Sequence, residues 1–260
     1  MNSRLTQIGF SQRVRLEWLE RTANLVLAGN DEASIYNALQ ELFEDKLSVG
    51  GNAKRGNREK VITILMKIWV RPPRDLHPLQ REGLKLLSHL PREDHIAVHW
   101  GMAMAVYPFW GAVAAHVGRL LRLQGTAAAS QVQRRVREQY GERGTVSRAA
   151  RRVLRSFVDW EVLKETSEKG IYTAGLSLAI AQVEVIAWLA EAFLHAHPNA
   201  SVALRTVLDS TSLFPFRLSP VSAAHLVAVS GRLDVLRHGL DQDLIMLREE
   251  SLPAAKGGGS

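Results

Sequence analysis

The sequence predicts a mainly α-helical protein in which one pair of helices leads directly into a short β-hairpin. Apolar residues recur with helical spacing along most of the 260 residues. A strongly amphipathic helix is expected over residues 146–158, and two strand-like segments, residues 160–163 and 171–173, follow it across a polar turn. Two helices, a tight connection and a hairpin in this order are typical of a winged helix-turn-helix.

The first part of the chain, residues 1–90, is expected to form a helical N-terminal bundle. Residues 12–28 have an amphipathic pattern, and Asp31 is expected to cap a second helix over residues 32–43. A third helix is expected over residues 57–69. Its apolar positions are spaced i, i+3, i+4 and i+7, as one buried helix face requires: Val61, Ile64, Leu65 and Ile68.

The middle part, residues 91–175, is expected to hold the winged helix-turn-helix domain. Two helices are predicted within residues 94–123, separated by Tyr107-Pro108, because a residue before proline disfavours helical backbone. Ser130 and Thr145 are expected to cap the two helices that precede the hairpin, since their hydroxyls can accept from free backbone N–H groups.

The last part, residues 176–252, is expected to be a helical extension with a possible second β-hairpin, and residues 253–260 a tail or linker. The expected elements are helices over residues 177–195, 201–208 and 220–229, and strands over residues 232–236 and 243–247. Residues 175–250 hold five basic and eight acidic side chains, a net charge of −3. This favours a protein-contact module over a second DNA reader; the alternative is that these helices complete one common core.

Composition excludes several classes of site. The chain has no cysteine, so it has no disulfide, zinc–thiolate site or cysteine nucleophile, and a reducing compartment is expected. No apolar run reaches the roughly 18 residues of a membrane span. The first 15 residues lack the apolar core of a signal peptide. The protein is therefore expected in the cytoplasm.

Basic residues are concentrated in two segments, although the net charge of the whole chain is only +7. Residues 126–155 hold eight arginines against two glutamates, a net +6, and residues 52–74 hold seven basic residues against one glutamate, again +6. Charge concentrated in this way indicates a polyanionic partner, and arginine suits phosphate and guanine contacts. The alternative is a solvated charged surface without a partner.

The predicted helix over residues 146–158 has two opposite faces. Its apolar face is formed by Val146, Ala150, Val153, Leu154, Phe157 and Val158. Its other face carries four arginines spaced i, i+3, i+4 and i+7: Arg148, Arg151, Arg152 and Arg155. One side can pack on a core while the other contacts bases or phosphates in the major groove. The alternative is an amphipathic surface helix that binds nothing.

The residues expected to contact DNA come from this helix, its neighbours and the first basic segment. Thr145 and Ser147 lie near a helix N-terminus, where phosphate is favoured, and two lysines lie in the hairpin. The full set is Arg134, Arg135, Arg137, Arg143, Thr145, Ser147, Arg148, Arg151, Arg152, Arg155, Lys164, Lys169, Lys54, Arg55, Arg58 and Lys60.

Other candidate sites are weaker. His95 and His99 are spaced i, i+4, which could place two imidazoles on one metal ion, but the glutamate of a zincin motif is missing and structural histidines are favoured. The aromatic group Tyr107, Phe109 and Trp110 could stack on bases, although packing at a helix junction is favoured. The chain has no phosphate-binding glycine loop and no nucleophile elbow. We therefore expect no enzyme, no metal and no cofactor.

Residues 144–163, GTVSRAARRVLRSFVDWEVL, resemble the winged-helix segment of the BrxA family, accessory proteins of bacteriophage-exclusion (BREX) defence systems. The order and spacing of the helices over residues 15–28, of the basic third helix and of the helix pair around residues 107–123 are also similar. The resemblance covers roughly residues 10–175. It implies a small, non-catalytic, helical DNA-binding protein encoded beside methyltransferase, ATPase and phosphatase-like genes.

Three functions remain open at this point. The leading expectation is a non-catalytic, duplex-DNA-binding accessory protein of a BREX-like phage-defence system. Its expected partners are double-stranded DNA and other defence proteins such as a methyltransferase or an ATPase, with a homo-oligomer possible and no membrane. The alternatives are a winged-helix transcriptional regulator and an RNA-binding helical protein.

Overall fold

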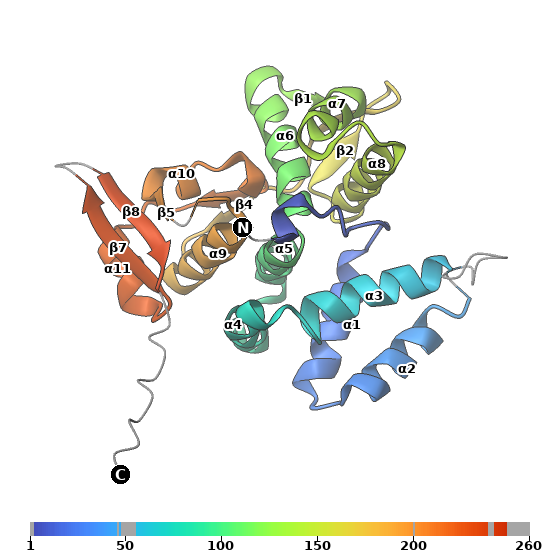
Figure 1. Cartoon of the computed structure of the whole chain (residues 1–260), viewed down its shortest axis with the longest axis horizontal. Helices are drawn as coiled ribbons and strands as arrows, with labels where there is room; N and C mark the ends of the chain where they lie inside the picture. The colour runs from blue at the N-terminus through green and yellow to red at the C-terminus, as the bar shows by residue number, and fades with distance from the viewer. Residues whose placement is uncertain (1–2, 46, 48–55, 200, 239–241, 249–260) are drawn as a thin grey trace, which may run out of the picture.

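Two apolar helices lie at the centre of the molecule, and several of the other helices pack against them. The computed structural model describes residues 3–45, 47, 56–199, 201–238 and 242–248, which form a mainly helical fold with three small sheets. Helices α5 (His95–Val106) and α9 (Val183–Ala196) pack against each other at the centre (Figure 1). Every residue of α5 after His95 is buried, as expected of a helix that is apolar on all sides.

Four helices form the N-terminal part, at the lower right and centre of Figure 1. They are α1 (Leu16–Leu27), α2 (Glu32–Leu42), α3 (Asn57–Trp69) and α4 (His77–His89). The predicted bounds of α3 are confirmed, and so is the cap on α2, where Asp31 accepts from the backbone N–H of Ser34 at 2.8 Å. Helix α4 was not predicted from the sequence.

The first helix begins four residues later than the sequence predicts, because the segment before it contacts α8 (Gly144–Asp159) instead of forming a helical turn. The backbone N–H of Val14 donates to Ser156 Oγ at 2.9 Å. The indole Nε1–H of Trp160, directly after α8, donates to the carbonyl oxygen of Val14 at 3.0 Å. Arg13 also pairs with Asp159 at the end of α8.

The central unit, residues 108–174, contains the predicted helix pair and hairpin. Its elements are α6 (Pro108–Gln124), β1 (Thr126–Ala128), α7 (Ala129–Tyr140), α8, β2 (Leu163–Glu165) and β3 (Ile171–Ala174). The strands form an antiparallel sheet in the order β1-β3-β2. The hairpin is confirmed, but its first strand begins at Leu163 because residues 160–162 still belong to the turn after α8.

The two caps predicted in this unit are wrong. Strand β1, which the sequence did not indicate, runs directly into α7, so the helix begins before Ser130 and the N-cap position is Ala128. Helix α8 begins at Gly144 with Arg143 as its N-cap residue, so Thr145 lies inside the first turn. Neither N-cap residue uses its side chain to cap the helix.

The C-terminal unit, residues 183–247, repeats the order of the central unit. Its elements are α9, β5 (Ser201–Ala203), α10 (Leu204–Leu208), α11 (Ala223–Val229), β7 (Leu233–His238) and β8 (Gln242–Leu247). Both units therefore run helix, strand, two helices, hairpin, and in both sheets the last strand lies in the middle: β1-β3-β2 and β5-β8-β7. The predicted second hairpin is confirmed.

Short segments connect and interrupt these units. The predicted helix over residues 177–195 is wrong in its first turns, because β4 (Leu178–Ile180) pairs in parallel with β6 (Phe216–Leu218), which lies between α10 and α11. The 3-10 turn η4 (Thr211–Leu213) lies against α6. There, a Cβ atom on Gly118 would come within 2.2 Å of the carbonyl oxygen of Thr211, so only glycine allows this approach.

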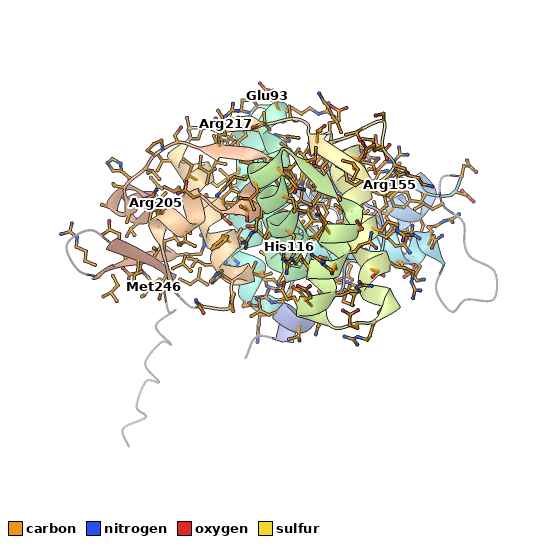
Figure 2. All side chains as sticks on the ribbon, turned by 90° about the horizontal axis from the view of Figure 1, so that it is seen from above. Glu93, His116, Arg155, Arg205, Arg217 and Met246 are labelled. Carbon is orange, nitrogen blue, oxygen red and sulfur yellow. The ribbon has the colours of Figure 1, made fainter. Side chains whose placement is uncertain are left out.

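One continuous cluster of buried apolar side chains extends from Phe10 to Ile245 and includes residues of all three parts. Its aromatic centre includes Trp100, which stacks on Phe157 with ring centroids 4.9 Å apart. Figure 2 shows the labelled Arg155 and Arg205, from the central and the C-terminal unit, on opposite sides of this core. The two units therefore share one interior but present separate surfaces.

Among the described residues, no single helix has the length and apolar character needed to cross a membrane. Residues 92–106 and α6 reach that length and composition only as a pair, and the pair is bent by 118°.

Candidate nucleic-acid interface

Helix α8 has the two faces that its sequence predicts. The buried face contains Val146, Ala149, Ala150, Val153, Leu154, Ser156 and Phe157. The four arginines of the helix are all exposed: Arg148, Arg151, Arg152 and Arg155. Contacts with α6, α7 and β2 hold the buried face in place, so the arginine face is presented by a fixed element rather than by a loop.

The arginines of the neighbouring helix α7 are paired with acidic side chains. Arg134 and Arg135 both lie near Glu138, at 3.9 and 3.0 Å. Arg137 lies 3.3 Å from Glu142. These are surface pairs that contribute little to stability, but they lower the net positive charge of α7. Residues 126–155 have a net charge of +6. The share of this positive charge that α7 presents to a partner is smaller than its number of arginines indicates.

Arg155 is also paired, with a residue of the hairpin. Its Nη1 lies 2.5 Å from Glu165 Oε1 at the end of β2. Figure 2 labels Arg155. The pair connects α8 to the hairpin. The sequence does not indicate the role of Glu165, because a separation of ten residues across a turn is not a helical spacing. The fold of the hairpin onto α8 brings the two side chains together.

Three arginines of α8 remain without an acidic partner in the part of the chain that the structure describes: Arg148, Arg151 and Arg152. All three are exposed. Their guanidinium groups keep their donors free for a ligand, and the fork geometry of guanidinium matches both phosphate oxygens and the guanine edge. Arg143, just before the helix, instead donates to the carbonyl oxygen of Tyr140 at 3.3 Å.

The remaining candidates near α8 are polar and accessible. Thr145 is exposed in the first turn of the helix, and Ser147 is half-buried. Lys164 in β2 and Lys169 in the turn of the hairpin are both exposed. In the sheet register Lys164 is opposite Thr173, and Thr173 is opposite Thr126, so a polar row crosses the sheet. The sequence did not predict strand β1, so it did not predict this polar row across the sheet.

The described part of the first basic segment has fewer free charges than its sequence indicates. Lys54 and Arg55 lie outside the described residues. Arg58 donates to the carbonyl oxygen of Glu44 at 2.7 Å, and Lys60 is half-buried. Helix α3, which carries Arg58 and Lys60, packs against α1, α2 and α5, whereas α8 packs in the central unit. The described candidates Arg58 and Lys60 therefore belong to a different group of packed helices from the candidates on α8.

Two other basic residues of this segment have internal roles. The Nζ of Lys67 lies 5.0 Å from the centre of the Tyr107 ring, a cation–π contact. Burial lowers the pKa of Lys67, and the nearby Arg4 lowers it further. Arg71 pairs with Glu32 at 2.7 Å. These contacts join helices rather than present charge to a ligand.

His95 and His99 belong to a buried hydrogen-bond network. Glu20 Oε1 lies 3.0 Å from His95 Nδ1, and Glu20 Oε2 lies 2.8 Å from His99 Nε2. The indole Nε1–H of Trp69 donates to His99 Nδ1 at 3.1 Å, which fixes the hydrogen of that imidazole on Nε2. The described residues contain no group of three or more histidines, cysteines or acids arranged to hold a metal ion. The hydrogen bonds to Glu20 and Trp69 are of the kind expected for structural histidines.

The aromatic group at the α5–α6 junction is part of the core, as favoured from the sequence. Tyr107, Phe109 and Trp110 are buried, and Trp110 lies against Phe157 with ring centroids 4.7 Å apart. The group therefore offers no surface on which a base could stack.

Comparisons with models of protein families, with curated proteins and with solved structures found no match to this chain. The candidate interface is thus defined by its own geometry alone.

Proposed function

We propose that this protein binds duplex DNA through helix α8 and the hairpin that follows it. The observation that carries the proposal is the group Arg148, Arg151 and Arg152, which is exposed and without acidic partners in the described chain, on a helix whose other face is fixed in the core. Helix, strand, two helices and hairpin, with the strand order β1-β3-β2, support a winged helix-turn-helix, in which the second helix of the pair enters the major groove.

The proposed contacts divide into two kinds. The three free arginines of α8 contact guanine edges or phosphates, while Thr145, Lys164 and Lys169 contact the backbone and orient the protein. The basic segment before and within α3, including Lys54, Arg55, Arg58 and Lys60, adds a second contact that does not depend on sequence. Neutralising that segment weakens binding to all duplexes about equally.

The role that we propose for DNA binding is that of a non-catalytic accessory protein in a BREX-like phage-defence system, acting in the cytoplasm with other defence proteins. Support comes from the resemblance of residues 144–163 and of the preceding helices to the BrxA family. A transcriptional regulator with the same DNA-binding element would instead protect one operator sequence strongly over random duplex DNA. Genes for a methyltransferase and an ATPase beside this one would support the defence role.

The test is a comparison of salt dependence between two triple variants. Replacing Arg148, Arg151 and Arg152 by alanine lowers affinity for random duplex DNA and lowers the slope of log K against log salt by about 0.9 for each lost phosphate contact. The matched control replaces three exposed arginines of other elements by alanine: Arg21, Arg81 and Arg92. Circular dichroism confirms that both variants are folded.

Two outcomes would contradict the proposal. The first is a folded α8 variant with the affinity and slope of the unchanged protein, since the arginine face would then not bind DNA. The second is that duplex RNA of the same length displaces the DNA at equal or lower concentration, which would favour the RNA-binding alternative.

A further inference from the structure

A cavity lies where the central unit meets the C-terminal unit. It has a volume of about 510 Å³, within the range of small-molecule sites in proteins. One wall is formed by α6 and the last residues of α7. The other is formed by the end of α9, by α10 and by η4. Sites between structural units are common places for ligands, because neither unit alone needs to fill the space.

The walls of the cavity suit a flat apolar molecule. On the α6 side, Ala112 and Ala115 are small and half-buried, so the helix leaves space beside it. On the opposite side Phe193 and His197 stack on each other, with ring centroids 5.1 Å apart and planes inclined by 25°. An aromatic ligand can contact this stacked pair through its own ring face or edge.

Two hydrogen-bond donors line the cavity without partners in the described chain. Tyr140 is only 8% exposed, and no hydrogen bond of its hydroxyl is found there. Burial raises the pKa of Tyr140 to about 12, so the hydroxyl keeps its proton. His197 Nδ1 accepts from the backbone N–H of Asn199 at 3.2 Å, which leaves the hydrogen of the neutral ring on Nε2. His197 is half-buried, and both residues line the cavity, so their donors are available to an acceptor oxygen bound there.

We propose that this cavity binds a small planar aromatic molecule with a carbonyl or carboxylate oxygen, which accepts from the Tyr140 hydroxyl and from His197 Nε2. The cavity is also connected through the backbone to the proposed DNA-binding helix α8. Tyr140 is the last residue of α7, and its carbonyl oxygen accepts from Arg143, just before α8 begins at Gly144. A ligand bound to the Tyr140 hydroxyl therefore restricts the motion of the connection between α7 and α8. The arginines of α8 are then fixed more firmly, and the affinity for DNA rises. This regulatory half of the inference rests on the proposed function.

The first experiment measures binding without DNA. Benzamide, benzoate and indole-3-carboxylate are titrated to millimolar concentration while the NMR methyl signals of Met104, Ala112 and Ala115 are followed. At least one probe shifts these signals saturably. Tyr140→Phe, which keeps the ring and removes the donor, weakens binding, and Ala115→Phe, which fills the space, abolishes it. Ala224→Phe, at an exposed position on α11, leaves binding unchanged. No shift with any probe, or unchanged binding in Ala115→Phe, overturns the site.

The second experiment measures the coupling to DNA. A saturating probe tightens binding to duplex DNA by about five-fold or more, and DNA tightens binding of the probe by the same factor, because coupling between two sites is reciprocal. Ala115→Phe removes this effect while binding DNA itself. Saturable probe binding with no change in DNA affinity leaves the site but overturns its regulatory role. If the protein does not bind DNA at all, the proposed function fails, and the first experiment still decides whether the cavity is a site.

Discussion

The half-buried carboxylate of Glu20 joins α1 to α5. Its two oxygens are each used by a histidine of α5, and one of these, His99, is itself held by Trp69 of α3. The hydrogen bond from His99 is the main reason that the pKa of Glu20 is lowered to about 2, against the opposing effect of burial. Burial lowers the pKa of His99 and so favours its neutral form. Three helices thus depend on one ionised group.

This network predicts a loss of stability in acid. Because the pKa of Glu20 is lower in the folded protein, the stabilisation is complete above the ordinary value of 4.5 and disappears as pH falls towards 2. The lowered pKa of His99 also reduces the stability of the folded protein as pH falls below 6.5, because protonation of the buried ring is unfavourable. Glu20→Gln lowers the free energy of unfolding at neutral pH by about 1–3 kcal/mol and flattens its decline below pH 4.5, as urea denaturation at a series of pH values would measure.

The control for this prediction lies on the same helix. Glu17 is exposed, and among the described residues its one ion pair is with Arg15, at 3.4 Å, so Glu17→Gln leaves the pH profile of stability nearly unchanged. A Glu20→Gln profile parallel to that of the unchanged protein would show that Glu20 does not have this role.

At the same scale, Gly101 allows α5 and α9 to approach each other closely. A Cβ atom at this position would lie 2.4 Å from Cζ3 of Trp188. Gly101→Ala therefore forces the indole or the helix to move and destabilises the protein by about 1–3 kcal/mol, measured as a lower midpoint of thermal or urea unfolding. Gly231→Ala is the control, since a Cβ there meets nothing within 4 Å. Equal stability of the two variants would contradict the packing argument.

At the scale of elements, helical spacing was the reliable signal. It predicted α3 and the apolar and arginine faces of α8, whereas two strand-like segments across a polar turn predicted the hairpin after it. The caps were wrong because Ser130 and Thr145 were judged by residue type, whereas the position of α7 depends on β1, a three-residue strand that exists only through pairing with distant β3. Helix α4 was missed although its sequence carries a helical pattern, with buried Leu79, Gly83, Leu86 and Leu87 at i, i+4, i+7 and i+8. A strand such as β1, in contrast, depends on tertiary contacts, which local patterns do not contain.

The ion pair between Arg155 and Glu165 could not be predicted from the sequence, because it also depends on tertiary contacts. It leads to a prediction about the hairpin. Glu165 neutralises Arg155, so Glu165→Ala both frees that guanidinium and removes a negative charge next to the proposed DNA surface. We expect tighter binding to duplex DNA and a salt slope steeper by up to about 0.9, measured by titration at several salt concentrations.

A matched control separates these two effects. Glu168 lies in the same hairpin and is exposed, but it forms no ion pair in the described chain. Glu168→Ala therefore removes the same charge without freeing an arginine and steepens the slope less. Identical slopes for the two variants would show that Arg155 contributes nothing once it is free.

At the scale of the whole molecule, the C-terminal unit shares the core of the rest. Residues 185–194 of α9 are all buried, and α9 packs against α4 and α5. The sequence indicated that this apolar helix must be buried, but it could not show which elements pack against it. The repeat of the central unit was also hidden from the sequence, since the two units share an order of elements and strands rather than a recurring residue pattern.

Truncation after Ala174 tests the consequence of the shared core. The shortened chain exposes the faces of α4 and α5 that α9 covers, including the pocket around Trp188, and we expect it to be insoluble or to lack a cooperative unfolding transition. A chain ending at Arg248 is the control and stays soluble. A soluble, folded 174-residue fragment that binds DNA normally would instead establish the C-terminal unit as a separate module.

The contact of Val14 with Ser156 and Trp160 has a consequence for the order of folding. The hydrogen bonds join residues 142 and 146 positions apart, so the ribosome makes one partner long before the other. Residues 13–15 have no place to dock until α8 has left the exit tunnel, and closing so large a loop is slow. A segment that is synthesised well before its partner is therefore among the last to reach its native position.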